Sequence, residues 1–254
     1  MLTENQLGPF ITIIPFVGLC ICLVGVFNTR QCPLLASTIA IWYLFVIMVA
    51  RANPFHDPDS LEWSENKIDD VPGVSLLIAG MMAPLVVFYL LFTKSPSAQS
   101  FVLKEVHMCH HMQFCFYRLI GMAFLYLYFT GVSQNYAVLH GGMCDVITAL
   151  TAIPLSQHIK THGLAESRGL VMTWSFFGLV VDFCTTFVLF SLNFLGYFQP
   201  QYSLAIFLQN PISTIMLFNV PLASAIHVLI ITRFDDMIEM GSVSSKFSPG
   251  YQSI

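Results

Sequence analysis

Seven long apolar runs constrain this chain more than any other feature of its sequence. A transmembrane helix needs about 20 apolar residues, because in hydrocarbon every backbone N–H and C=O group must be satisfied within the segment itself. Charged residues make up only 9% of the chain, against roughly a quarter in an average soluble domain. The mean hydropathy is +0.73. The sequence therefore predicts an all-α membrane protein, a single-domain bundle of seven transmembrane helices over residues 1–254.

The runs place the predicted spans at about 9–27, 34–50, 74–93, 114–130, 137–156, 170–195 and 207–232. Short loops that carry Lys and Arg stay on the cytoplasmic side. With the N-terminus outside, eight of the ten basic residues fall inside, and only Arg51 and Lys67 fall outside. We therefore expect the N-terminus outside and the C-terminus in the cytoplasm. The first residues, MLTENQLGPF, lack the basic start of a secretory signal peptide, so we expect the first run to remain as a span.

Two aspartates lie within these apolar runs. Asp145 belongs to LHGGMCDVITAL and Asp182 to FFGLVVDFCTT. An ionisable side chain at a helix centre costs roughly 2.5–3.5 kcal/mol in a membrane, so it indicates a functional site by default. Gly141 and Gly178 each precede one aspartate by four residues and share its helix face. Because small residues let helices approach closely, we expect the two helices to be neighbours.

The sequence predicts a buried polar centre at helices five to seven. Asn219 is expected at a similar depth, two residues before a proline that can kink the last helix. The candidate binding residues are Asp145, Asp182, Asn219, Thr148, Thr185 and His227. Two close carboxylates, one of them holding a proton, could relay protons or bind a cation. The alternatives are a polar ligand pocket and an interhelical clamp in which Asp182 bonds Trp174 or a threonine of a neighbouring helix.

Histidines cluster on the predicted inner side. His107, His110 and His111 form H-M-C-H-H, and His158 and His162 form H-I-K-T-H. Such spacings place two imidazoles on one helix face, where they can hold a transition metal. The clusters resemble the histidine boxes of membrane fatty-acid desaturases and hydroxylases, although those enzymes have three boxes in another order. One alternative is therefore a metal oxidoreductase at the cytoplasmic face, and the other is a solvated surface cluster.

Four segments carry a second resemblance: FYRLIG, HGGMCDVITALTAIPLS, WSFFGLVVDF and NPISTIMLFNVPLASAIHVLIITR. Over residues 114–233 the chain resembles a group of bacterial polytopic integral membrane proteins with no assigned biochemical role. The resemblance implies that Asp145, Asp182, Pro221 and His227 belong to a sequence pattern that this group of proteins shares. It also implies location in a bacterial inner membrane. His140 departs from the pattern, which has a small residue there.

Three classes of function follow. The first is a transporter or channel-like protein in which the acidic centre handles a proton, a cation or a small polar solute. The second is the metal oxidoreductase, and the third is a structural or accessory subunit of a membrane complex. The buried acids within apolar spans favour a non-enzymatic role, with the lipid bilayer and other membrane subunits as partners. A net charge of −4 argues against nucleic acid. Arg118, at the predicted inner rim of the fourth span, is interpreted as a headgroup anchor.

Overall fold

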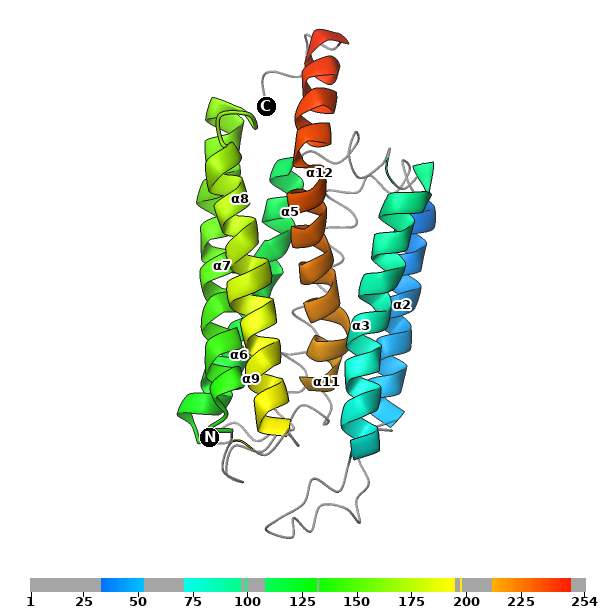
Figure 1. Ribbon diagram of the computed structural model, residues 1–254, viewed down its shortest axis with the longest axis vertical. Coiled ribbons are helices and arrows are strands. Elements are labelled where there is room, and N and C mark those ends of the chain that lie inside the picture. The colour runs from blue at the N-terminus through cyan, green and yellow to red at the C-terminus, as the bar shows by residue number, and fades with distance from the viewer. Residues whose placement is uncertain are drawn as a thin grey trace.

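The computed structural model describes residues 33–52, 71–96, 99, 108–131, 133–194, 197 and 212–247. Within these ranges every regular element is a helix, and the helices run side by side along the long axis of the molecule (Figure 1). The all-helical part of the sequence prediction is therefore confirmed. The first predicted span, 9–27, lies outside the described residues.

The helices form rods in which α, 3₁₀ and π segments follow one another. Two rods are single helices near the start of the chain, α2 (Pro33–Ala52) and α3 (Val71–Lys94). The next comprises α5 (Met108–Phe114), the 3₁₀ segment η2 (Cys115–Ile120) and α6 (Gly121–Phe129). Then come α7 (Tyr136–His162) and the rod of α8 (Arg168–Phe176), the π segment η3 (Phe177–Cys184) and α9 (Thr185–Phe194). The last comprises α11 (Ile212–Thr214), the π segment η5 (Ile215–Asn219) and α12 (Val220–Phe247).

Four rods are long and apolar enough to cross a membrane: His111–Phe129, Tyr136–His162, Arg168–Asn193 and Ile212–Glu239. The apolar stretches of α2 and α3 are shorter, Ala40–Val49 and Ser75–Leu90. Large apolar side chains are exposed on the outer faces, among them Ile41 at 67% and Phe129 at 75%. Such surfaces are compatible with an integral membrane protein, since lipid tails can cover them.

The last rod forms the centre of the bundle. It packs against α2, α3, α8 and η3, and it stands between the α2–α3 pair and the remaining helices (Figure 1). Over residues 212–230 its side chains are almost all buried, with Phe218 and Ile230 at 1% and 0% exposure. The rod thus occupies the position of a core helix, which explains why it is the most apolar of the four.

Helix α7 joins the two neighbouring rods through small residues. It packs against η2 and α6 on one side and against η3 and α9 on the other, so the two aspartate-bearing helices are neighbours, as predicted. A Cβ added to Gly121 would lie 2.8 Å from the carbonyl oxygen of Gly142, and one added to Gly142 would lie 2.9 Å from that of Gly121. The two backbones are therefore in direct contact, which only glycine permits.

Three of the rods contain a segment that departs from α geometry: η2 and η3 lie in the middle of their rods, and η5 lies near the start of the last rod. Pro221 follows η5 closely and has no N–H to donate to the carbonyl of Leu217, so regular α bonding cannot continue there. Single-turn π segments are frequent at functional sites because they change the direction in which side chains point. The three irregular segments bear Arg118, Asp182 and Asn219 of the polar centre, respectively.

Replacing Gly121 by alanine is expected to destabilise the protein by roughly 1–3 kcal/mol, because backbone atoms cannot move aside for the new methyl group. Chemical unfolding of the detergent-solubilised protein measures the change. Gly169 is the matched control, since a Cβ there meets nothing within 4 Å. Gly169→Ala should be neutral or stabilising by up to about 1 kcal/mol. Equal unfolding free energies for the two variants would contradict the close contact.

Candidate functional site

The guanidinium of Arg118 is the centre of a buried polar cluster. Its Nε donates to Oδ1 of Asp145 at 2.6 Å, and its Nη2 donates to Oδ2 of Asp182. Its Nη1 lies 2.8 Å from Nε2 of His227. Arg118 is only 4% exposed, so these contacts are made away from solvent. One side chain from η2 thereby connects α7, η3 and α12.

The contact with Arg118 determines the hydrogen-bonding role of His227. An arginine can only donate, so Nε2 of the imidazole must accept, and the ring is neutral with its proton on Nδ1. The ring centroid lies 4.8 Å from that of Trp174, at 57°. A Cβ at Gly178 would collide with the imidazole, so this glycine leaves the space that His227 occupies. The histidine is therefore held by packing on two sides.

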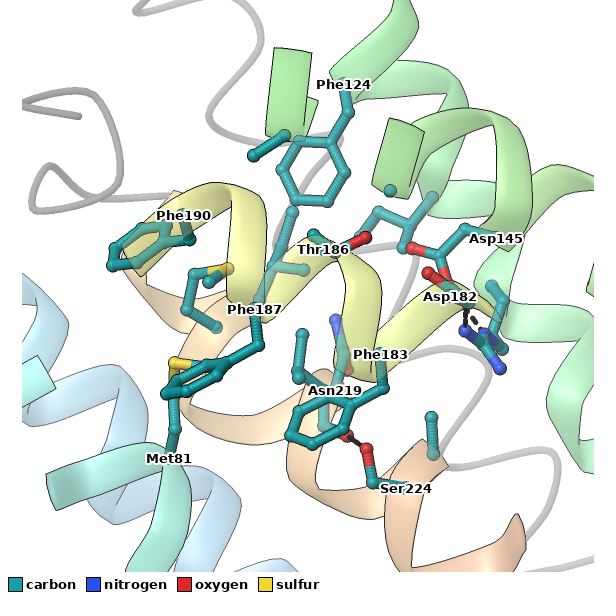
Figure 2. A pocket seen from close by; sticks show the side chains of 18 of the residues that line it. Met81, Phe124, Asp145, Asp182, Phe183, Thr186, Phe187, Phe190, Asn219 and Ser224 are labelled. Atoms are coloured by element: carbon teal, nitrogen blue, oxygen red, sulfur yellow. Dashed lines mark hydrogen bonds and ion pairs between the residues drawn. The ribbon is translucent and has the colours of Figure 1, made fainter. Parts of the chain in front are cut away.

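The cluster carries more acid than base. Asp145 and Asp182 contact the same guanidinium, and Figure 2 shows their carboxyl groups next to each other. Two carboxylates and one guanidinium sum to a charge of −1 when all three are ionised, because His227 is neutral. No other basic side chain of the described ranges forms an ion pair with either acid. The arrangement can hold one proton between the carboxyl groups, or one monovalent cation beside them.

A cavity of about 60 Å³ adjoins the cluster. Most of its wall is apolar, and its polar lining consists of Tyr117, Arg118, Asp145, Asp182, Thr186, Asn219 and Ser224. Figure 2 shows the two aspartates, Thr186 and Asn219 around this space. At roughly 30 Å³ per molecule, the cavity has room for about two waters, and its polar groups could bind them.

Asn219 lies on the η5 side of the cavity and is 4% exposed. Its backbone carbonyl accepts a hydrogen bond from Oη of Tyr117 at 2.8 Å. Its side-chain Nδ2 has no hydrogen-bond partner among the residues that the structure describes. A buried amide without a partner is costly, and each case in a folded protein requires an explanation such as a bound water or ligand.

The structure brings together most of the predicted binding residues but not all of them. Asp145, Asp182 and His227 meet at Arg118, and Asn219 borders the adjoining cavity. Thr148 is fully buried on the opposite side of the cluster, near Trp174, whose Nε1 lies 3.3 Å from the Thr148 carbonyl oxygen.

Thr185 is exposed and donates to the carbonyl of Val180, so it points away from the acids. Its neighbour Thr186 lines the cavity instead.

The interpretation of Arg118 as a headgroup anchor is wrong. The rod begins at Met108 rather than at residue 114, and Met112 is 0% exposed, so Arg118 lies well inside the bundle. The bond between Asp182 and Trp174, one form of the clamp alternative, is not made, since Trp174 donates to Thr151 Oγ1 at 3.1 Å and to the Thr148 carbonyl. A signal for Arg118 was present in the sequence: two buried acids require a cation, and Arg118 is the one basic residue inside a predicted span.

The described histidines of the two clusters lie near one end of the bundle, where α5 packs against α7. His158 and His162 stack with ring centroids 4.1 Å apart at the exposed end of α7. His111 is buried, whereas His107 and the side chain of His110 lie outside the described residues. Within the described part of the chain, no three His, Cys, Asp or Glu side chains gather in a way that could hold a metal ion. The metal site therefore stays a prediction.

Comparison with protein-family models, curated proteins and solved structures finds no match to this chain. The resemblance to bacterial membrane proteins therefore also stays a prediction.

Replacing Arg118 by methionine is expected to destabilise the protein by about 3–5 kcal/mol, because two buried carboxylates lose their partner. The triple variant Arg118→Met, Asp145→Asn, Asp182→Asn should recover most of this loss, since it removes the unpaired charges as well. Unfolding in detergent, followed by circular dichroism, measures both effects.

Arg168→Met is the control, because Arg168 forms an exposed ion pair with Asp235 at 2.9 Å. Exposed pairs contribute about 0–1 kcal/mol. If Arg118→Met were no more destabilising than Arg168→Met, the buried ion cluster would not be a main support of the fold.

Proposed function

We propose that this integral membrane protein binds and releases a proton at the Arg118–Asp145–Asp182 cluster and uses that proton in transport across the membrane. The observation that carries the proposal is the second carboxylate. One aspartate already neutralises Arg118, and the other adds a buried negative charge.

The charge balance makes this site responsive to protons. An uncompensated charge costs several kcal/mol in a low-dielectric interior. A proton shared by the two carboxyl groups removes the excess charge with little movement of the side chains, because the same guanidinium already holds both groups. Loss of that proton restores the charge, which then favours uptake of another cation. The cluster can therefore alternate between two charge states.

The depth of the cluster supports a role in transport. Asp182 is 14 residues from Arg168 (182 − 168) and 11 residues from Asn193 (193 − 182), the two ends of its span. At about 1.5 Å per residue, it lies roughly 21 Å and 16 Å from the two ends of this helix, and therefore near the middle of a hydrocarbon layer about 30 Å thick. Ionisable groups near the midplane are typical of proton relays and substrate sites.

A purely structural clamp is the rival function. A clamp needs only the pairing of Arg118 with one acid, and the second acid would reduce its net stabilisation. The two functions differ in what they require of the pair: proton transport requires a carboxyl group that changes its protonation, whereas a clamp works in a single charge state.

Infrared spectroscopy of the bilayer-reconstituted protein tests for this change of protonation. We expect a carboxylic acid C=O band that disappears as the pH is raised, and that is absent from Asp145→Asn and from Asp182→Asn. Proton flux into liposomes should fall at least tenfold in both variants.

Asp235→Asn is the matched control, since Asp235 also forms an ion pair with an arginine, Arg168, but on the surface of the protein. It should keep both the band and the flux. A wild-type protein without a titrating band, or with flux equal to that of Asp182→Asn, would leave only the clamp.

We further infer that the chain crosses a bacterial inner membrane seven times, with its N-terminus outside and its C-terminus in the cytoplasm. The support is the distribution of Lys and Arg, eight inside against two outside. A green fluorescent protein fused to the C-terminus should fluoresce, and alkaline phosphatase fused there should be inactive. Fusions after Ser60 should give the reverse pattern. The same pattern at both positions would contradict this topology.

A further inference from the structure

We propose that the cavity beside the acid pair binds a small alkylammonium ion of about the size of methylammonium, in exchange for the proton. This inference rests on the proposed function, because it assigns a substrate class to the same site. It is carried by three features of the cavity: its charge, its aromatic wall and the unpartnered amide of Asn219.

The charge favours a monovalent cation. Both aspartates line the cavity, so an occupant meets a net charge of −1 whenever the shared proton is absent. A proton and a monovalent cation each neutralise the same single negative charge, so the site holds one or the other but not both. Binding of one cation must then release one proton, which is the coupling that an exchange transporter needs.

The wall favours an organic cation over Na⁺. Four phenylalanines and Met81 line the cavity (Figure 2), the phenylalanines being Phe124, Phe183, Phe187 and Phe190. Met216 lines it as well. Aromatic rings attract ammonium groups, and the attraction grows when the cation is desolvated. A small metal ion would instead need several oxygen ligands placed together to replace its hydration shell, whereas most of this wall is apolar.

Asn219 supplies a directed polar contact. Its side-chain amide is buried, borders the cavity and has an Nδ2 without a partner in the described part of the chain. Rotation of the amide by a half-turn places its oxygen in the same position, where it can accept a hydrogen bond from an ammonium N–H. The acids and Asn219 would then hold the ammonium group from two sides of the cavity.

The volume limits the size of the occupant. The cavity measures about 60 Å³, less than half of the roughly 150 Å³ that accommodates benzene in another protein. An ammonium group with one or two carbon atoms fits this space. A tetraethylammonium ion is too large.

The cavity also lies on one side of the ion cluster. Ala137 and Gly141 precede Asp145 in α7, and Phe187 and Phe190 follow Asp182 in α9. Since α7 and the rod of α8 and α9 run in opposite directions (Figure 1), these residues lie toward the same end of the bundle. The other side of the cluster is occupied by the packed rings of His227 and Trp174. The cation therefore approaches from the end of the bundle where α7 begins.

The test uses the full chain in lipid nanodiscs, in weak buffer with a pH indicator, at a pH where the infrared acid band is present. Methylammonium chloride should bind, release about one proton per ion bound and abolish the acid band. Tetraethylammonium and Na⁺ should do neither. Phe187→Leu should weaken methylammonium binding roughly 5- to 30-fold, the loss expected for a desolvated cation–π contact. Phe176→Leu is the matched control, because Phe176 is 56% exposed on α8, and it should bind like the wild type.

The outcomes separate this inference from the proposed function. If the acid band titrates normally but methylammonium neither binds nor releases a proton, the cation site is overturned and the proton site stands. Equal affinities for Phe187→Leu and Phe176→Leu would also overturn the site, since the ion would then bind outside the cavity. If the wild-type protein has no titrating acid band, the proposed function fails, and the exchange fails with it.

Discussion

The ion cluster around Arg118 is the interaction on which the rest of this structure depends. Its guanidinium has nitrogens directed at Asp145, Asp182 and His227, which belong to three different rods. In a bundle whose other contacts are mostly apolar, such directional bonds define which helices lie together and at what height. A lipid-exposed helix can slide along an apolar neighbour at little cost, whereas a buried ion pair cannot be shifted by one residue without leaving a charge unpaired.

The backbone is adapted to this cluster. Contact between Gly121 and Gly142 brings η2 and α7 close enough for Arg118 to reach Asp145, and the missing Cβ of Gly178 leaves space for the imidazole of His227. The 3₁₀ and π segments occur in the rods that carry Arg118, Asp182 and Asn219. Glycine and irregular helix geometry are both unfavourable on their own. Their presence around one site indicates that its geometry, rather than helix stability, determines the sequence there.

The helical architecture and part of the site could be predicted from the sequence. Long apolar runs require helices, and the spacing of Gly141 and Gly178 from the aspartates indicated that the two helices are neighbours. Arg118 was misplaced because the polar stretch before Phe114 suggested a loop, whereas the helix continues back through this stretch and buries Met112 and His111. Regular α periodicity places both Thr185 and Thr186 on the face of Asp182. In the π segment each N–H bonds to the carbonyl five residues earlier, so the residues that share a face with Asp182 come one position later in the sequence. Thr186 therefore reaches the cavity and Thr185 does not.

Magic-angle-spinning NMR of the protein in bilayers tests the central claim most directly, with ¹⁵N in the arginine guanidinium groups and ¹³C in the aspartate carboxyl groups. The background variant Asp235→Asn, Asp236→Asn removes the surface pairs with Arg168 and Arg233. Strong ¹³C–¹⁵N dipolar coupling should remain for two carboxyl groups, and it should disappear when Arg118 is replaced by methionine. Coupling that is unaffected by this replacement would show that Arg118 does not join the two acids, and it would contradict the central role of the ion cluster.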